Sequence, residues 1–171
     1  QKTGLPPVSA VVMEYPQDEA ARNLDDEYFF GKDLLVCPLT LEDGTSREVY
    51  LPEGNWYNFF TGEKIEGGRR LVLEADWNEM LVFARDGALV PVAEPVICVT
   101  EDTVFNITVK SFGTNKTGSC VLYEDDFVSF NYESLVAKKQ INVTVGDNGK
   151  FIVSGAKTST KYHFLNCIVK D

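Results

Sequence analysis

The sequence has only one histidine, His163, and its cysteines never occur as Cys-x-x-Cys, so the usual ligand sets of structural zinc sites are absent. It has no apolar run of the roughly 20 residues needed to cross a bilayer, and no apolar signal core follows Gln1–Gly4. Basic residues are also few, since 16 Lys and Arg stand against 26 Asp and Glu, which gives a net charge of -10. Such a charge repels phosphate backbones, so we expect neither a nucleic-acid partner nor a membrane partner.

The four cysteines, Cys37, Cys98, Cys120 and Cys167, each lie among apolar residues on a predicted strand. A free thiol in that setting packs like a small hydrophobic side chain, and we predict that the cysteines are buried and free. One alternative stays open, a disulfide that joins two of the last three, which lie in one half of the chain. The sequence does not decide which two would pair.

What the sequence does contain is a large apolar fraction arranged in short runs. Apolar residues make up 44% of the 171 positions, which is enough for one large β-domain or two small ones. Val, Phe, Tyr, Ile and Thr form the runs, and Gly, Asn, Asp and Pro interrupt them at short intervals. This pattern is typical of antiparallel strands. It predicts an all-β fold built of antiparallel β-sandwich domains.

The N-terminal segment has a different pattern. Val8–Met13 is a continuous apolar run, which suggests a strand buried on both faces, as in a parallel sheet. Gln17–Tyr28 is rich in acidic residues and has a helical or turn-like pattern. One buried strand and a short helix cannot form a domain alone. We therefore interpret residues 1–32 as the last strand and helix of a (β/α)8 barrel whose other strands are absent.

Residues 33–92 are predicted to form a first antiparallel β-domain. Its most characteristic turn is Pro52–Asn55, where the proline presets φ and the glycine accepts a positive φ. Pro91–Pro95 begins and ends with proline, which stiffens the connector and removes ladder donors, so we place the domain boundary there. The expected strands of this domain are 34–38, 48–51, 56–60, 70–74, 80–84 and 88–91.

Residues 93–171 are predicted to form a second β-domain, a small sandwich. Short apolar strands recur there at nearly regular spacing, between turns that carry Gly, Asn and Asp. The expected strands are 96–99, 104–109, 118–124, 129–132, 139–145, 150–153 and 162–169.

Several strings resemble one known enzyme family. Gly4–Pro16 ends in Met-Glu-Tyr-Pro, Phe30–Val36 reads Phe-Gly-Lys-Asp-Leu-Leu-Val, and Tyr50–Tyr57 reads Tyr-Leu-Pro-Glu-Gly-Asn-Trp-Tyr. Val82–Pro91 and the acidic turn Leu122–Asp126 follow in the order in which that family carries similar strings. Together they resemble glycoside hydrolase family 31, the α-glucosidases and α-xylosidases, at the junction between the catalytic barrel and its C-terminal β-domains.

The resemblance implies a domain order, with residues 1–32 as the end of the catalytic barrel, 33–92 as a proximal β-domain and 93–171 as a distal β-sandwich. It implies that the parent is a retaining α-glycosidase that hydrolyses α-linked glucosides or xylosides without a cofactor. These residues would pack on the parent's own catalytic barrel and stabilise it, while the complete protein binds the carbohydrate substrate. The compartment is left open, with a soluble periplasmic or secreted parent favoured over a cytoplasmic one.

Catalytic residues are not expected in this chain. Retaining hydrolysis needs two carboxyl groups about 5–5.5 Å apart in one rigid site. In the family these belong to two aspartates on earlier barrel strands, and neither of their motifs occurs in this sequence. The resemblance therefore carries no catalytic residue, metal ligand or cofactor contact onto the chain, and it identifies no substrate-binding residue. We expect the chain on its own to be a fragment that catalyses nothing.

Local carboxylate clusters do not replace the missing pair. Glu124–Asp126 are contiguous, so their side chains diverge at a solvated hairpin tip, where a calcium contact is the alternative. Asp18 and Asp25–Glu27 are expected to form an acidic surface beside the helix. The barrel interpretation places Glu14 at the C-terminal end of a strand, where barrel sites form, and a substrate contact is a minor alternative there.

The aromatic run Trp56–Phe60 admits two interpretations. An exposed row of rings would stack on sugars, whereas alternation places successive rings on opposite faces of a strand, so that at least one face packs in the core. We favour packing, with rings that fasten the β-domain to the barrel. An exposed platform would instead indicate a free-standing carbohydrate-binding or structural β-sandwich module, which is the alternative function.

Two smaller features complete the candidates. His163 has no partner at catalytic spacing and is expected to be structural. Asn106, Asn115 and Asn142 each begin an N-x-Thr sequence, which matters only if the parent is secreted from a eukaryotic cell.

Overall fold

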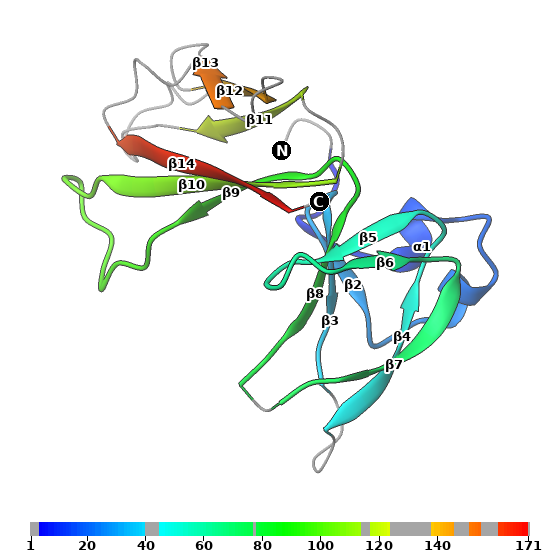
Figure 1. Cartoon of the computed structure of the whole chain (residues 1–171). Helices are drawn as coiled ribbons and strands as arrows, with labels where there is room; N and C mark the ends of the chain where they lie inside the picture. Colours follow the sequence, from blue (N-terminus) through cyan, green and yellow to red (C-terminus); the bar gives the residue numbers. More distant parts are fainter. Residues whose placement is uncertain are drawn as a thin grey trace. The chain divides into compact units, whose positions relative to one another are not determined.

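The computed structural model describes residues 4–39, 45–76, 78–113, 117–123, 138–145, 151–154 and 161–170. The chain forms two compact units and passes from the first to the second between Asp86 and Gly87 (Figure 1). Nearly all of the regular structure in the described residues is β-strand, together with two helical segments of four residues each. The predicted all-β fold is confirmed. The domain boundary predicted at Pro91–Pro95 stays a prediction.

The first unit is built from two antiparallel sheets. One has six strands in the order β1-β2-β3-β8-β5-β6, and the other is the pair β4-β7. The elements are β1 Val8–Ala10, α1 Val11–Glu14, the 3-10 helix η1 Ala20–Asn23, β2 Tyr28–Phe30, β3 Leu34–Cys37, β4 Ser46–Leu51, β5 Asn55–Asn58, β6 Lys64–Glu66, β7 Arg69–Glu74 and β8 Leu81–Arg85.

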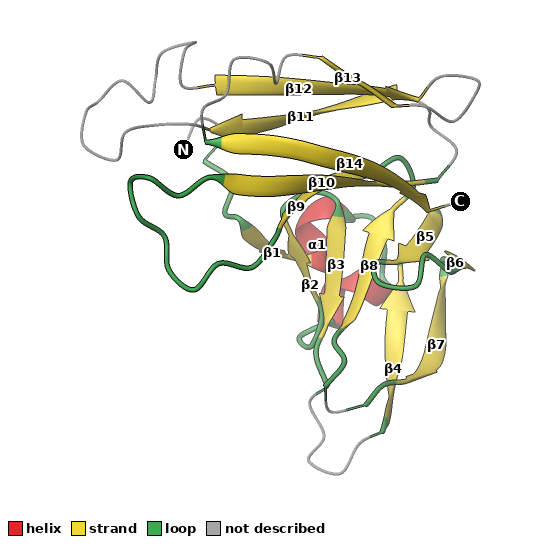
Figure 2. Ribbon diagram, turned by 60° about the vertical axis from the view of Figure 1, so that its left-hand side comes forward, coloured by secondary structure: helices red, strands yellow, loops and turns green. Residues whose placement is uncertain are grey.

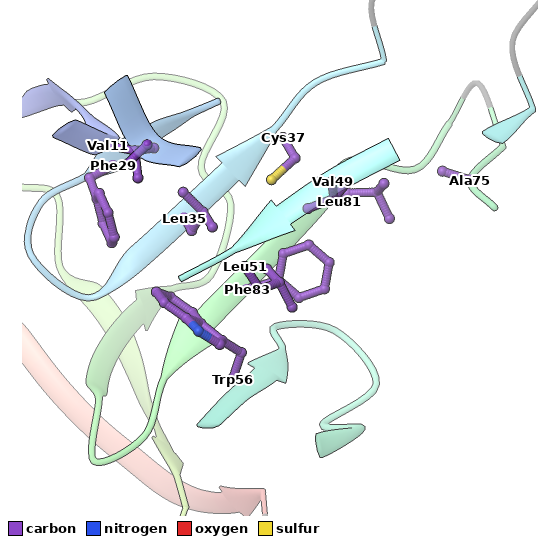
Figure 3. Packing of buried hydrophobic residues seen from close by; sticks show 11 residues of the cluster. Val11, Phe29, Leu35, Cys37, Val49, Leu51, Trp56, Ala75, Leu81 and Phe83 are labelled. Carbon is purple, nitrogen blue, oxygen red and sulfur yellow. The ribbon is translucent and has the colours of Figure 1, made fainter. Parts of the chain in front are cut away.

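The core of the first unit lies between these two sheets (Figure 3). In β4 alternate residues face inward, and Val49 and Leu51 are both fully buried. From the six-stranded sheet, Phe29, Leu35 and Phe83 lie side by side on neighbouring strands and belong to the same cluster. The alternation of residues along these strands thus gives a sandwich with one apolar layer.

Trp56 of β5 closes one end of this core. Its side chain is fully buried, and its indole N–H donates to the carbonyl oxygen of Pro52 at 2.7 Å. A Cβ atom at Gly67 would stand 2.8 Å from the indole nitrogen and closer still to the Pro52 oxygen, so only glycine fits there. In the turn at residues 52–55, Gly54 adopts a φ of 130°, as the sequence predicts. The indole therefore connects this turn to the β6–β7 turn.

The N-terminal segment differs from the predicted barrel strand. β1 is an edge strand paired antiparallel with β2, so that Val8 lies opposite Phe30. The predicted strand Val8–Met13 is split, because α1 begins at Val11, and this helix lies behind β2 and β3 in the view of Figure 2. The side chain of Val11 is buried and belongs to the core cluster. A short apolar run fits a strand or a helical segment equally well, which is why its pattern misled the prediction. The structure does not show a barrel remnant.

The second unit contains two three-stranded sheets, β14-β10-β9 and β11-β12-β13. Ile107, Val109 and Cys167 form its buried cluster, and Leu122 of β11 packs against them. Most of the predicted strands are found within a few residues of their expected bounds. The strands are β9 Leu89–Ala93, β10 Phe105–Phe112, β11 Thr117–Tyr123, β12 Lys138–Val145, β13 Phe151–Ser154 and β14 Tyr162–Lys170.

Two predictions for the second unit are corrected. β10 pairs antiparallel with β9 but parallel with β14, so this sheet is not purely antiparallel. Residues 96–99 are not a strand. They lie in the loop between β9 and β10, where Ile97 is fully exposed (106%). The predicted strand 129–132 lies outside the described residues.

Candidate functional site

A buried ionic cluster lies in the first unit, where Arg47 contacts two carboxylates. Arg47 occupies an inward position of β4, two residues before Val49, and its side chain is buried. Its Nη2 atom donates to Asp26 Oδ2 at 2.7 Å and lies 3.5 Å from Glu27 Oε1. Its Nη1 atom donates to the Asp26 carbonyl at 3.2 Å and to the Pro38 carbonyl. The guanidinium therefore connects β4 to the segment before β2 and to the end of β3.

Glu27 is the buried carboxylate of this cluster. It lies two residues before Phe29, so the two side chains face the same way into the sandwich. Its Oε1 atom accepts the N–H of Tyr50 at 2.7 Å, whereas Oε2 has no hydrogen-bond partner among the described residues. Burial raises the pKa of Glu27 to about 7, and this outweighs the Tyr50 hydrogen bond and the charge of Arg47, which lower it. The predicted acidic surface is thus wrong for Glu27.

The raised pKa of Glu27 predicts a specific pH dependence of stability. The folded state binds this proton more tightly than the unfolded chain, so the stabilisation is fully present below pH 4.5 and is lost as the pH rises through about 7. We expect the free energy of unfolding of the first unit to fall by about 3 kcal/mol over this range, relative to Glu27→Gln. The variant keeps an acceptor for the Tyr50 N–H but does not titrate.

Urea titrations followed by tryptophan fluorescence near pH 5 and pH 8 measure this difference, because both tryptophans, Trp56 and Trp77, belong to the first unit. The other carboxylates contribute equally to the pH dependence of stability in the wild type and in Glu27→Gln, so their effect cancels in the comparison. If the unfolding free energy changed by the same amount between pH 5 and pH 8 in the wild type and in Glu27→Gln, the raised pKa of Glu27 would be contradicted.

A second arginine, Arg85 at the end of β8, is enclosed by aromatic rings. Its guanidinium carbon lies 5.4 Å from the ring centroid of Tyr15 and 5.1 Å from that of Phe29. The Trp56 ring is 5.8 Å away, so the cation contacts three π-faces. Its Nη2 atom is 4.0 Å from Glu14 Oε2. Glu14 therefore lies beside the sandwich at the end of α1, and not at the end of a barrel strand as predicted.

Asp18 supports the fold through two hydrogen bonds. Its Oδ1 atom accepts the N–H of Ala20 at 2.9 Å, and its Oδ2 atom accepts the hydroxyl of Tyr50 at 2.6 Å. Burial and this hydrogen bond raise the pKa of Tyr50 to about 12, so the hydroxyl keeps its proton and remains the donor. Asp18 thus joins the turn after α1 to β4.

An open depression of about 870 Å³ lies next to the Asp18–Tyr50 hydrogen bond. The turn after α1 and the β6–β7 turn form its walls, and Glu14, Glu53 and Glu66 add their carboxylates to that of Asp18. These are exposed turns, open to water. The buried Glu27 does not line the depression.

The aromatic run at residues 56–60 packs and does not form an exposed row. Trp56 and Tyr57 are both buried, although alternation directs them to opposite faces of β5. Phe60 is 56% exposed and lies in the turn after β5, edge-on to Phe59 at a centroid distance of 5.3 Å. The packing interpretation is confirmed. The role of these rings in fastening the unit to a barrel stays a prediction.

The cysteines follow the prediction in part. Cys37 and Cys167 are buried free thiols, whereas Cys98 is free but exposed, because its segment is a loop and not a strand. Burial raises the pKa of the Cys37 thiol, so this thiol stays protonated and is no nucleophile at neutral pH. The side chain of Cys120 lies outside the described part of the structure.

Other predicted candidates are dispersed. Glu124–Asp126 and Asn115 lie outside the described residues, and Asn142 lies on β12. His163 is exposed on β14, opposite Asn106 of β10. Within the described ranges no three metal-binding side chains gather at one point. No helix in those ranges has the length and apolar character needed to span a membrane.

Comparison with known proteins identifies the family of this fold. Residues 4–90 match the family model described as the glycosyl hydrolase family 31 C-terminal domain. The chain belongs to glycosyl hydrolase family 31. In this family the matched domain is the C-terminal part of larger enzymes, so it belongs with a catalytic domain.

Relatives in family 31 are much longer than this chain. Alpha-glucosidase 2 of Bacillus thermoamyloliquefaciens is 34% identical over 155 residues, which are 90% of this chain and 20% of that protein. The structure of the alpha-xylosidase from Xanthomonas citri has a TM-score of 0.77 and 30% identity, and the match covers 100% of this chain and 19% of that one. A Flavobacterium johnsoniae dextranase complexed with glucose has a TM-score of 0.76 and 32% identity, covering 88% and 19%. The chain thus spans about a fifth of the length of these relatives.

Family 31 membership also explains the N-terminal segment. The match to the C-terminal domain begins at residue 4, before β1, and β1 pairs within the antiparallel sheet of that domain. The string Gly4–Pro16 therefore indicated the right family, but its interpretation as a barrel strand is not supported.

Proposed function

We propose that this chain is the non-catalytic C-terminal portion of a retaining α-glycosidase that hydrolyses α-linked glucosides or xylosides. Its role in the complete enzyme is to pack on the catalytic domain and to stabilise it. The named activities of the similar proteins, an alpha-glucosidase and an alpha-xylosidase among them, support this class of reaction. The sugar and the linkage belong to the catalytic domain.

The observation that carries the proposal is the match of residues 4–90 to a C-terminal domain of glycosidases, in a chain about a fifth as long as its relatives. A domain that is part of larger enzymes, and that contains its own core, is suited to a structural role.

The chemistry of the first unit supports the same role. Asp26 is bound to Arg47, and Asp18 is bound to Tyr50. Glu27 is buried among these residues and is not accessible to a substrate. These acidic side chains hold strands together, and none of them forms a water-excluded carboxyl pair open to a sugar. The partners proposed are the catalytic domain and, for the complete protein, a carbohydrate. The net charge of -10 argues against nucleic acid.

The test compares the complete protein with the isolated 171-residue chain. The complete protein is expected to hydrolyse p-nitrophenyl α-glucoside or α-xyloside with retention of the anomeric configuration, measured by NMR of the first product. The isolated chain is expected to show no hydrolysis, and isothermal titration with glucose or xylose oligomers should give no heat of binding. Hydrolysis by the isolated chain, or inversion by the complete protein, would overturn the proposal.

A further inference from the structure

One edge of strand β7 pairs with no other strand in the part of the chain that the structure describes. Strand β7 belongs to the sheet β4-β7, and Figure 2 shows its two strands side by side. The register between them runs without interruption from one end of β7 to the other. Proline and β-bulges, two common devices that keep an edge strand from pairing with another chain, do not occur in β7. The strand therefore presents a regular edge along its whole length.

The direction of the backbone groups shows which residues of β7 face this edge. On β4 the N–H of Tyr50 donates to Glu27 Oε1 at 2.7 Å, so it points away from β7. Arg70 lies directly opposite Tyr50, and opposite residues of an antiparallel pair either both bond across the ladder or both point away from it. Arg70 therefore directs its N–H and C=O away from β4. Val72 and Glu74 follow at intervals of two and direct theirs the same way.

The side chains of the same three residues form an exposed row. Leu71 and Leu73 pack against the core cluster, and the residues between and beside them point outward. In that row Arg70 and Glu74 are exposed, and Val72 between them is 71% exposed. The exposed row of β7 thus consists of a cation, a large apolar side chain and an anion.

We propose that the edge of β7 pairs antiparallel with β7 of a second copy of this chain, about a two-fold axis that passes beside Val72. In this register Val72 lies opposite its own copy, and Arg70 of each chain lies opposite Glu74 of the other. Oppositely charged residues directly across from each other stabilise an antiparallel pair. The outward N–H and C=O groups of all three residues bond across the interface, since such residues exchange both hydrogen bonds.

The charges favour this arrangement over the other ways in which two β7 edges could meet. Parallel pairing in register would place Arg70 opposite Arg70 and Glu74 opposite Glu74, and like charges directly opposite are destabilising. The two-fold pair also closes, because it uses the free edge of β7 in both chains. On the other edge of β4, Glu27 already accepts the Tyr50 N–H. The assembly is therefore a dimer with a continuous sheet β4-β7-β7-β4, and not a fibre.

The dimer is expected to be weak. A single strand pair buries little surface, so we expect a dissociation constant of about 10–100 µM. Enzyme assays and urea titrations use lower protein concentrations, at which the protein is a monomer. The pairing does not depend on the proposed scaffold role, because it involves neither the catalytic domain nor a sugar.

Sedimentation velocity of the isolated 171-residue chain and of the complete protein tests the pairing. Between about 1 and 200 µM the weight-average mass of each is expected to rise toward twice that of the monomer. Val72→Lys should keep both at the monomer mass, because it places two like charges together at the axis. A constant monomer mass for the wild-type chain, or a dimer that Val72→Lys does not weaken, would overturn the proposal. Dimerisation of the isolated chain alone would also overturn it, because the catalytic domain would then cover the edge.

Exchanged charges test the register. Glu74→Arg places an arginine opposite Arg70 of the second copy, and Arg70→Glu places a glutamate opposite Glu74, so each variant alone should dimerise at least about tenfold more weakly. An equimolar mixture of the two should dimerise within about threefold of the wild type, since both charged pairs across the interface then join opposite charges. Glu63→Arg is the matched control, because it changes the net charge equally at an exposed turn, and it should leave dimerisation unchanged. Circular dichroism checks that each variant is folded. A mixture that dimerised no better than its folded components would overturn the proposal.

Discussion

Arg47→Ala is expected to lower the free energy of unfolding of the first unit by about 3–5 kcal/mol at pH 8. The arginine is buried and binds Asp26 at 2.7 Å, and its charge offsets part of the cost of ionised Glu27. Removing it leaves Glu27 buried without a counter-charge and leaves the Asp26 and Pro38 carbonyls without their donor. Near pH 5 the loss should be smaller, because Glu27 is then protonated. Urea denaturation followed by tryptophan fluorescence measures both values.

The chain offers a matched control for this substitution. Arg70 forms an ion pair of similar length with Glu48, 2.9 Å, but both side chains are exposed. Arg70→Ala should therefore cost less than about 1 kcal/mol. Adding Glu27→Gln to Arg47→Ala should recover part of the lost stability, since it removes the uncompensated charge. If Arg47→Ala cost no more than Arg70→Ala, the buried cluster would have no special part in stability.

Trp56→Ala is expected to destabilise the first unit by about 3–5 kcal/mol. The indole is fully buried, contacts Phe29 at a centroid distance of 6.1 Å and donates to the Pro52 carbonyl. Its loss opens a cavity in the sandwich and also removes one of the three rings around Arg85. Amide hydrogen exchange of β8 measures the effect without relying on tryptophan fluorescence. The protection of these amides should fall in step with the loss of unfolding free energy.

Two further variants separate the contributions of Trp56. Trp56→Phe keeps an aromatic ring but loses the hydrogen bond to Pro52, so we expect a smaller loss of about 1–3 kcal/mol. Phe60→Ala removes an exposed ring from the same aromatic run and should change stability by no more than about 0.5 kcal/mol. Equal effects of Trp56→Ala and Phe60→Ala would show that the run does not pack as described.

Much of the fold follows from local sequence patterns. Strands β3, β5, β7 and β8 were predictable because each is a short apolar run bounded by turn residues, and the positive φ of Gly54 follows from its place in the turn. Alternation predicts that at least one of Trp56 and Tyr57 faces the core, because the two faces of β5 cannot both be solvated in a strand of a sandwich, and the structure buries both.

The N-terminal segment shows where such patterns fail. The continuous apolar run Val8–Met13 predicts a lone barrel strand, but its first residues belong to an antiparallel sheet. The sheet is antiparallel, yet the resemblance to family 31 is confirmed, because the C-terminal domain of that family itself includes residue 4 onward. The mistaken step was the domain assignment, since continuous apolarity indicates burial on two faces but does not identify what covers them.

The ionic cluster was missed for a different reason. Charged residues are rarely buried, so an acidic stretch such as Asp25–Glu27 is normally interpreted as surface. A signal was nevertheless present. Arg47 precedes Val49 by two residues, so it occupies a core-facing position of β4. Glu27 lies just before β2 and precedes Phe29 by two residues, so it faces the core as Phe29 does. That the two lie close together depends on how β2 and β4 pack, which no local pattern specifies.

The most direct test of the scaffold role is to measure kcat/KM and the rate of heat inactivation of the complete enzyme with Arg47→Ala, beside Arg70→Ala. If residues 4–86 stabilise the catalytic domain without taking part in the reaction, Arg47→Ala should accelerate heat inactivation at least about tenfold. Its kcat/KM at low temperature should stay within about twofold of wild type, and Arg70→Ala should change neither quantity. A large loss of kcat in a folded Arg47→Ala enzyme, or no change in its inactivation rate, would contradict the account.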